Sequence, residues 1–201
     1  MIESNFRAKV QPFFDWISRQ LIKFGITGNI ATLISFISGL LCGIFIWLNF
    51  LYLALILLWV SGLFDVLDGT IARILKNSKK AGAYLDLFSD RVVEVVVILG
   101  FTFLLPENYL AYILFLISLL MHFSTFLISG ALFKNETQKS FKYDKSLVER
   151  AEAFIAFSFM MIFPIYAFEI LMFFTVLVFA CAVSRFYRVL EFAKKVDKGL
   201  I

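Results

Sequence analysis

The stretch YLALILLWVSGLFDVLDGTIARIL, residues 52–75, combines a long apolar run with charged residues in its second half. A run of about 20 apolar residues is the length that an α-helix needs to cross a bilayer. Asp65, Asp68 and Arg73 lie toward its end. Placing an aspartate at the centre of a membrane helix costs about 2.5–3.5 kcal/mol even on mild insertion scales. Because of this cost, we expect these charged residues to have a function.

Apolar runs of this kind recur along the whole chain of 201 residues. Hydrophobic residues make up 61% of the sequence, and the mean hydropathy is +0.89. Soluble globular proteins are closer to half apolar, so the composition predicts an integral membrane protein. Cys42 and Cys181 lie within apolar runs and indicate neither a disulfide framework nor a metal site. Nothing in the sequence indicates a nucleic-acid partner.

We expect an all-α, polytopic membrane protein with six transmembrane helices and an N-terminal amphipathic helix at the membrane interface. The expected spans are about residues 29–50, 52–75, 83–105, 109–133, 147–167 and 170–190. Residues 1–201 should form a single membrane domain, with the interfacial helix in 1–27 and the six-helix bundle in 28–201. Gly39 and Gly43 are expected to permit close helix packing within the bundle.

The basic residues predict the orientation of the bundle. All 19 Lys and Arg fall in four places, namely the N-terminal segment, residues 73–91, residues 134–150 and the tail from Arg185. The connections near Asn49, Glu107 and Glu169 contain none. The positive-inside rule then places both termini and the basic loops in the cytoplasm of a prokaryotic cell. Residues 6–24 combine aromatic and aliphatic residues with basic ones at roughly helical spacing. This pattern is typical of an amphipathic helix on a membrane surface.

Two pairs of aspartates define the candidate site. Asp65 and Asp68 are three residues apart, and Asp86 and Asp90 are four apart, so each pair shares one face of a helix. At 1.5 Å per residue, both pairs lie roughly 6–15 Å from the cytoplasmic ends of their spans. A short connection through residues 76–81 would bring the four carboxylates together just below the cytoplasmic surface.

Four neighbouring carboxylates in a low dielectric require compensation by cations. Arg73 and Arg91 are the basic residues closest to the motif, and they are too few. Oxygen ligands suit hard divalent ions, so the pattern predicts Mg²⁺ or Mn²⁺. Two ions sharing carboxylates are the arrangement that assists displacement at phosphorus. Gly69 and Gly82 would allow a ligand or a neighbouring backbone to approach closely.

The segment from Asp65 to Asp90 has the spacing D-x2-D-G-x2-A-R-x8-G-x3-D-x3-D, which resembles the full signature of the CDP-alcohol phosphatidyltransferases. The upstream segment KFGITGNIATLISF, residues 23–36, is similar to the start of that family's first span. Thr27, Asn29 and Thr32 match there, whereas Gly28 stands where the family usually has proline. The resemblance is greatest to members that make phosphatidylinositol phosphate or archaetidylinositol phosphate.

The resemblance implies an enzyme of phospholipid biosynthesis. A CDP-lipid such as CDP-diacylglycerol would donate its lipid-phosphoryl group to an alcohol hydroxyl, and CMP would leave. Asp65, Asp68 and Asp86 would be metal ligands, while Asp90 would be both a ligand and the catalytic general base. A homodimer is also implied. The residues implied to contact the CDP-lipid are Gly28, Asn29, Ile30, Ala31, Gly69, Arg73, Lys79 and Gly82.

The second half of the chain is expected to bind the acceptor, a small polar alcohol. In SLVERAEAF, residues 146–154, Arg150 matches an element of members that use inositol phosphate, although Ala153 replaces a further arginine. Arg185 and Arg188 lie near the end of the last span. The guanidinium group suits phosphate, so these arginines would bind inositol phosphate or glycerol 3-phosphate. They could equally be ordinary anchors of helix ends, and serine stays open as the acceptor.

A divalent-cation transporter is the alternative from a different class. A transport pathway places ionisable residues near the bilayer midplane, in related positions of two halves of the chain. Here the acidic motif lies at one side of the membrane, and the last two spans hold no matching set. The distribution therefore favours the transferase.

Overall fold

Helices make up almost all of the backbone described by the computed structural model, which covers residues 2–77, 80–133 and 150–198. Side chains are described from Val10 onward in the first range and from Ala151 onward in the last. The all-α prediction is confirmed for these ranges. The elements are α1 Ile2–Lys23, α2 Gly28–Trp47, α3 Leu51–Ile74, α4 Lys80–Leu104, η1 Pro106–Asn108, α5 Tyr109–Leu132, α6 Arg150–Ile162, η2 Pro164–Tyr166 and α7 Ala167–Asp197.

The helices end where the local chemistry interrupts them. Asn49 adopts a left-handed conformation with φ of 61° between α2 and α3, which Asn tolerates better than most residues. Pro106 and Pro164 each start a 3₁₀ turn before the next long helix. Glu169 lies in the first turn of α7, so the break between the last two helices comes before it.

Four segments of the described chain are long and apolar enough to cross a membrane: α2, α3, η1 with α5, and η2 with α7. The apolar part of α6, Ala151–Ile162, is shorter. Helix α4 has 25 residues, but its first 15 residues include the charged side chains of Asp86, Asp90, Arg91 and Glu94. Among the described residues, four of the six predicted spans therefore have the length and composition of a membrane-crossing helix, and the count of six stays a prediction.

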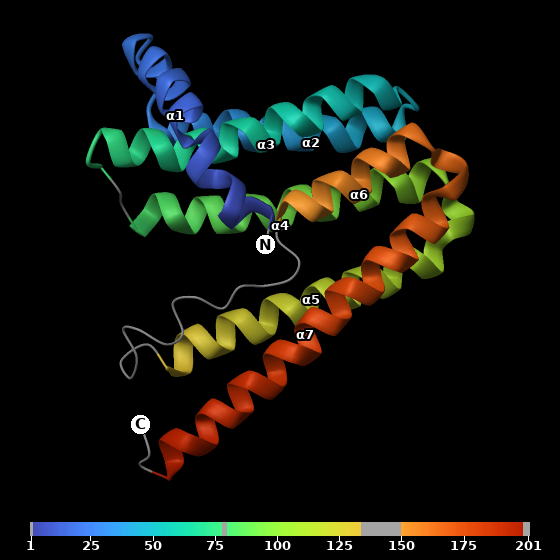
Figure 1. The fold of residues 1–201 in the computed structure, drawn as a ribbon. Coiled ribbons are helices and arrows are strands. Elements are labelled where there is room, and N and C mark those ends of the chain that lie inside the picture. Colours follow the sequence, from blue (N-terminus) through green and yellow to red (C-terminus); the bar gives the residue numbers. More distant parts are fainter. Residues whose placement is uncertain (1, 78–79, 134–149, 199–201) are drawn as a thin grey trace.

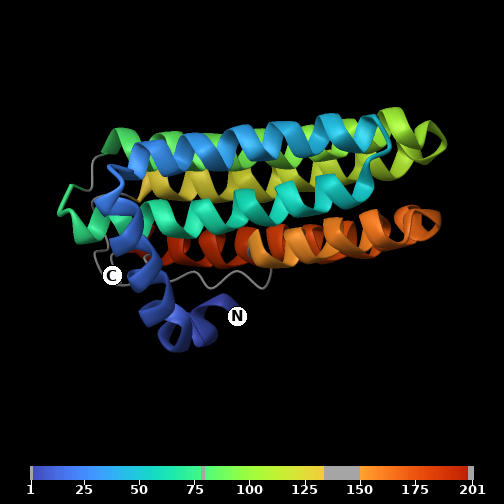
Figure 2. The same cartoon turned by 90° about the horizontal axis from the view of Figure 1, so that it is seen from above.

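Helices α2, α3, α4 and α6 run along nearly the same direction, whereas α5 and α7 run obliquely away from them in Figure 1, and α1 leaves the bundle at an angle (Figures 1 and 2). Helix α2 packs against both α3 and α4, α5 packs against α7, and α6 contacts both α3 and α7. Three phenylalanines join the second group, because the Phe115 ring lies 6.0 Å from that of Phe157 and 5.8 Å from that of Phe174. The indole nitrogen of Trp59 donates to Ser158 Oγ at 3.1 Å and links α3 to α6.

Glycines allow α2 and α4 to approach closely. A Cβ atom at Gly39 would overlap the side chain of Val93, and one at Gly43 would lie 2.5 Å from the carbonyl oxygen of Val96. A Cβ at Gly100 would overlap the carbonyl group of Gly43. The expectation that Gly39 and Gly43 permit close packing is confirmed. Because van der Waals contact is a main source of helix association in membranes, this seam fixes α4 against α2.

Helix α1 has an inner apolar face and an outer aromatic one. Its inner residues pack on a small cluster formed by Ala31, Leu67 and Ile71. The outer face presents Phe13 and Trp16, which are 59% and 60% exposed. The inner residues are Phe14, Ile17, Leu21 and Ile22.

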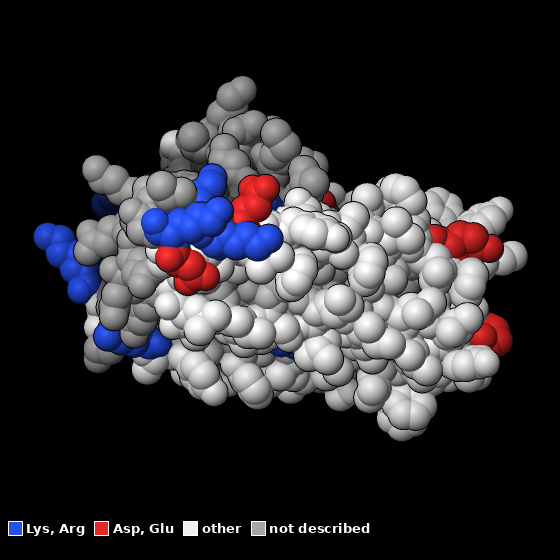
Figure 3. All heavy atoms as spheres, turned by 90° about the horizontal axis from the view of Figure 1, so that it is seen from below, with Lys and Arg blue, Asp and Glu red and all other residues white. Residues whose placement is uncertain are grey.

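The two ends of the bundle differ in charge. The end near the start of α2 and the end of α3 carries lysines and arginines together with acidic residues (Figure 3). The opposite end carries only acidic side chains in that view, and the connections there contain Glu107 and Glu169 without any Lys or Arg. This is the asymmetry that the sequence predicted.

Candidate active site

The aspartates come together at the basic end of the bundle because α3 ends and α4 begins there. Asp65 and Asp68 lie in the last turns of α3, and Asp86 lies in the second turn of α4. Each of these three carboxylates offers an oxygen, and the three oxygens lie within 4.8 Å of one another. The structure therefore brings together three of the four aspartates that the sequence singled out.

Asp90 lies one turn further along α4 than Asp86. It is outside the compact group of three, although its charge acts on Asp86, as do those of Asp65 and Asp68. Asp90 is half-buried. Its separate position is consistent with a different task, but its predicted roles as ligand and base are not tested by its position alone.

The electrostatic situation of the cluster is unfavourable without a cation. Asp68 is only 7% exposed, while Asp65 and Asp86 are half-buried. Like charges this close disfavour simultaneous ionisation. The nearby arginines have other contacts: Arg73 donates to Thr70 Oγ1 at 2.9 Å, and Arg91 pairs with Glu94 at 2.7 Å. A proton or a bound cation would relieve the repulsion.

The first turns of α2 form the opposite wall of the site. Thr27 caps this helix by accepting a hydrogen bond from the Ile30 amide at 3.4 Å. A Cβ at position 28 would lie 3.2 Å from the carbonyl oxygen of Asp68, so Gly28 lets α2 rest on the α3 backbone. One turn later, the Thr32 hydroxyl donates to Asp68 Oδ2 at 2.5 Å.

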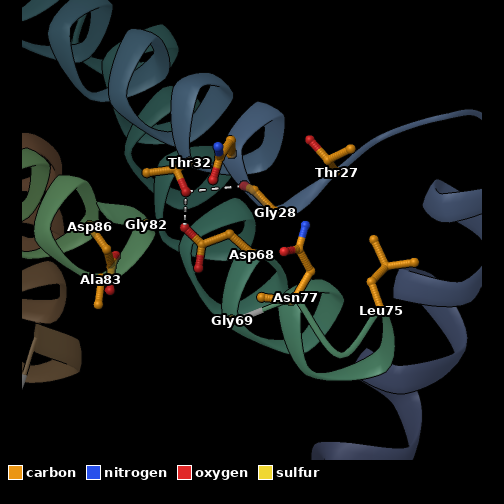
Figure 4. Close-up of a pocket in the computed structure, with 12 residues that line it drawn as sticks. Thr27, Gly28, Thr32, Asp68, Gly69, Leu75, Asn77, Gly82, Ala83 and Asp86 are labelled. Atoms are coloured by element: carbon orange, nitrogen blue, oxygen red, sulfur yellow. Dashed lines mark hydrogen bonds between the residues drawn. The ribbon is translucent and has the colours of Figure 1, made fainter. Parts of the chain in front are cut away.

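A cavity of about 380 Å³ lies between these three helices (Figure 4). Its wall includes two of the clustered carboxylates, Asp68 and Asp86, together with Gly69. Among the described residues, no atom lies within 4 Å of where a Cβ at Gly69 would be, so this glycine leaves the cavity open. The lining residues are Thr27, Gly28, Asn29, Thr32, Asp68, Gly69, Ala72, Leu75, Asn77, Gly82, Ala83 and Asp86.

The donor-binding residues predicted from the resemblance separate into two groups. Gly28, Asn29, Gly69 and Gly82 line the cavity. The remaining four are not among the described lining residues. Ala31 is fully buried against Leu67 and Ile71, Ile30 is 42% exposed, Arg73 is exposed, and Lys79 lies outside the described residues.

The predicted acceptor-binding arginines lie on the second half of the bundle. Arg185 is 5% exposed, and its guanidinium lies 5.6 Å from the centre of the Phe126 ring. Arg188 is exposed, and its Nε donates to the carbonyl oxygen of Ser184 at 3.4 Å. Arg150 begins α6, but its side chain is outside the described part of the chain.

Several residues of the cavity wall had no role in the sequence predictions. Thr32 belonged to the quoted upstream segment, yet its bond to Asp68 joins residues 36 positions apart. Asn77 lies three residues after the end of α3 and lines the cavity. The available signals in the sequence were the polarity of Asn77 within the aspartate motif and of Thr32 within the upstream segment. Only the packing of α2 on α3 shows where they face.

These features define a helical membrane protein with a carboxylate-lined cavity at the basic end of its bundle. Residues 28–186 match the CDP-alcohol phosphatidyltransferase family. The chain belongs to this family and is a CDP-alcohol phosphatidyltransferase. Membership favours the transferase over the cation transporter.

Two curated relatives are similar over most of the chain. The inner membrane protein YnjF of Escherichia coli is 31% identical over 172 residues, which cover 82% of this chain and 83% of that protein. Phosphatidylinositol phosphate synthase of Corynebacterium glutamicum is 31% identical over 153 residues, covering 74% of this chain and 68% of that one. With the apolar helices, these relatives identify an integral membrane protein.

The fold is also similar to that of a solved enzyme. Phosphatidylinositol phosphate synthase of Mycobacterium tuberculosis with CDP-DAG bound gives a TM-score of 0.72 at 19% identity, covering 88% of this chain and 92% of that one. The same enzyme in complex with manganese and citrate gives a TM-score of 0.73 at 19% identity, covering 88% of each chain. These matches establish a shared fold.

The crowding of carboxylates predicts a gain in stability when one of them is neutralised. In EDTA, Asp86→Asn should raise the midpoint of thermal unfolding by roughly a few degrees, which corresponds to about 1 kcal/mol. The measurement is thermal unfolding of the purified full chain in detergent. Glu107→Gln, an exposed change at the opposite end of the bundle, is the control and should leave the midpoint unchanged. An Asp86→Asn midpoint at or below that of the wild type would contradict the repulsion.

Proposed function

We propose that this enzyme transfers the lipid-phosphoryl group of a CDP-lipid such as CDP-diacylglycerol to the hydroxyl of a small polar alcohol, releasing CMP. The observation that carries the proposal is the carboxylate cluster, with three ligand oxygens within 4.8 Å beside the cavity. The donor's two acyl chains belong in the bilayer, and its nucleotide is water-soluble. A cavity at one end of a membrane bundle suits both parts.

The chemistry of the donor set fits a divalent metal. Asp65, Asp68 and Asp86 supply only carboxylate oxygens, which hard ions such as Mg²⁺ and Mn²⁺ prefer. We assign these three residues and Asp90 as the ligands of a two-metal site. When bound, the ions would neutralise the diphosphate charge and that of the departing CMP. The manganese complex of the M. tuberculosis enzyme, which shares the fold, supports this assignment.

The CDP-lipid would occupy the cavity. Gly28, Asn29, Gly69 and Gly82 line it, and glycines let the backbone approach a ligand closely. We keep Ile30, Ala31, Arg73 and Lys79 as proposed donor contacts from the family resemblance. For Arg73 the contact would be a phosphate. Arg73 is exposed and donates to Thr70 Oγ1 through one nitrogen of its guanidinium group, which has five N–H donors in all.

Asp90 would act as the general base. The hydroxyl oxygen of the acceptor forms a bond to the lipid-bearing phosphorus, and the bond from that phosphorus to the CMP oxygen breaks. The hydroxyl proton passes to the Asp90 carboxylate, and CMP leaves with the electron pair. A positioned base of this kind contributes typically 10²–10⁴-fold to a rate.

We propose a phosphorylated alcohol as the acceptor, either inositol phosphate or glycerol 3-phosphate, bound by Arg150, Arg185 and Arg188. Arg185 supports this proposal best. It is buried at 5% exposure, which is unusual for a residue that merely anchors a helix end. Two relatives are named as synthases of inositol phosphate lipids, the C. glutamicum enzyme above and an archaetidylinositol phosphate synthase of Pyrococcus horikoshii. Serine is the remaining alternative.

We further propose that α2 to α7 form six spans of one membrane domain over residues 1–201, with both termini and the active site in the cytoplasm. The charge asymmetry between the ends of the bundle supports this orientation. Helix α1 would lie at the cytoplasmic interface. Its exposed Trp16 and Phe13 would enter the headgroup region, and Arg19 and Lys23 are exposed for contact with anionic lipids. A homodimer is proposed from the family resemblance.

The general-base assignment predicts a selective loss of turnover. Asp90→Asn should lower the rate of CMP release from CDP-diacylglycerol by at least about 100-fold, while binding of the donor largely survives. The assay uses purified protein with Mg²⁺ or Mn²⁺ and a panel of acceptors that comprises inositol phosphate, glycerol 3-phosphate and serine. The exposed change Asp197→Asn is the matched control. Retained turnover in Asp90→Asn would exclude this base, and a wild type without acceptor-dependent CMP release would contradict the proposed reaction.

The acceptor site predicts an effect on one substrate only. Arg185→Gln should raise the KM of the phosphorylated acceptor by about 10- to 100-fold, because a hydrogen bond to a charged group contributes about 1.5–3 kcal/mol. The KM of CDP-diacylglycerol should stay unchanged. Lys194→Gln, an exposed change on the same helix, is the control. An equal rise in both KM values would assign Arg185 to general packing against Phe126.

A further inference from the structure

The hydroxyl of Thr32 makes a contact that sets it apart from the other threonines of the bundle. Both Thr32 and Asp68 are buried, at 9% and 7% exposure. The hydroxyl oxygen lies 2.5 Å from Asp68 Oδ2 in α3 and 3.1 Å from the carbonyl oxygen of Gly28 in its own helix (Figure 4). A hydroxyl has one proton to donate, so these two acceptors compete for it.

The carboxylate is the stronger competitor. A threonine within a helix commonly donates to the carbonyl four residues earlier, and Thr70, Thr102 and Thr175 do so at 3.0, 2.9 and 2.7 Å. Thr32 has the same local acceptor at a longer distance and a closer acceptor in another helix. Hydrogen bonds to ionised acceptors are the shorter and stronger ones. The proton of Thr32 is therefore directed at Asp68.

The start of α2 thus holds Asp68 at two points. Gly28 allows contact with the backbone of Asp68, at 3.2 Å from the carbonyl oxygen to the position that a Cβ would take. One turn later, Thr32 holds Oδ2 of the side chain. A neutral donor also has an advantage over lysine or arginine, since it orients a carboxylate without cancelling the charge that a metal ion requires.

We propose that Thr32 is a positioning residue for the metal site: its hydroxyl fixes the carboxylate of Asp68 in the orientation that binds a divalent cation. The inference rests on the proposed function, because it takes Asp68 as a metal ligand. Groups that hold a metal ligand in place typically contribute 10- to 100-fold to metal affinity.

A purely structural tie between α2 and α3 is the competing explanation, and the chain contains a control for it. Ser35, one turn further along α2, donates to the carbonyl oxygen of Ser61 in α3 at 2.8 Å and is 3% exposed. Ser35→Ala removes a buried bond between the same two helices without touching a carboxylate. Thr175→Val repeats the Thr32 substitution at a similarly buried site on α7, where the hydroxyl donates within its own helix.

The test measures binding of Mn²⁺ alone to the purified full chain, using the electron paramagnetic resonance signal of free Mn²⁺. Thr32→Val should weaken binding by about 10- to 100-fold, and Thr32→Ser, which keeps the hydroxyl, should stay close to wild type. Ser35→Ala and Thr175→Val should bind as the wild type does. Thr32→Ala is a second variant in case the valine protein does not fold. Thermal unfolding in EDTA shows whether Thr32→Val costs no more stability than Ser35→Ala.

Three outcomes would overturn the inference. Wild-type affinity in both Thr32→Val and Thr32→Ala would show that the hydroxyl does not affect the metal. A loss in Thr32→Ser equal to that in Thr32→Val would show the same. An equal loss in Ser35→Ala would assign the effect to helix packing. By contrast, a wild type that binds Mn²⁺ no better than Asp65→Asn would contradict the metal site itself, and with it the proposed function.

Discussion

Repulsion among carboxylates is the constraint that the site imposes on the rest of the molecule. Two unit charges about 4 Å apart interact by about 4 kcal/mol at an effective dielectric constant of 20, and three ligand oxygens lie within 4.8 Å here. The packing of α2, α3 and α4 must hold the helices together against this force. In the seam between α2 and α4, Gly39 allows close contact with the Val93 side chain, and Gly43 and Gly100 allow close backbone contact, so this seam holds the two helices together. Helix packing thus brings the carboxylates together before a cation binds, so binding does not have to assemble the site.

Under the proposed function, the two halves of the bundle have different roles. Helices α2, α3 and α4 supply the aspartates and the cavity, and α5 to α7 supply the arginines proposed for the acceptor. Helix α6 connects them, since it contacts α3 and α7, and Trp59 in α3 donates to Ser158 in α6. Under the proposed function, the neighbouring helices α2, α3 and α4 form the donor site. The attacking hydroxyl of the acceptor would meet the donor at the aspartates, which lie in α3 and α4.

Local periodicity made much of this predictable. Apolar runs gave the bounds of α2 to α5 to within three residues, whereas α6 ends five residues earlier and α7 seven residues later than expected. The three- and four-residue spacings of the aspartates gave a shared face on each of α3 and α4. Which residues of α2 face the cavity was not predictable in the same way. The resemblance implies donor contacts for residues 28–31 together, but a helix turns about 100° per residue, so consecutive residues point in different directions. Gly28 and Asn29 face it, whereas Ala31 packs on Leu67.

Contacts between distant helices lay beyond the reach of sequence patterns. The bond from Thr32 to Asp68 depends on the rotation of α2 about its own axis, and the approach of Arg185 to Phe126 depends on the crossing of α5 and α7. Neither is encoded in a local spacing. Helix α4 also shows how charge affects the recognition of a span. It is as long as its neighbours, but its charged side chains lower its hydropathy, and it is not among the four candidate spans.

The central claim is that the aspartate cluster is a divalent-metal site, and the most direct measurement is anomalous diffraction at the manganese edge from crystals of the full chain grown with Mn²⁺. The account predicts anomalous density between the carboxylates of Asp65, Asp68 and Asp86, with Oδ2 of Asp68 still bonded to Thr32. Well-ordered aspartates without anomalous density between them, in crystals soaked to millimolar Mn²⁺, would contradict it.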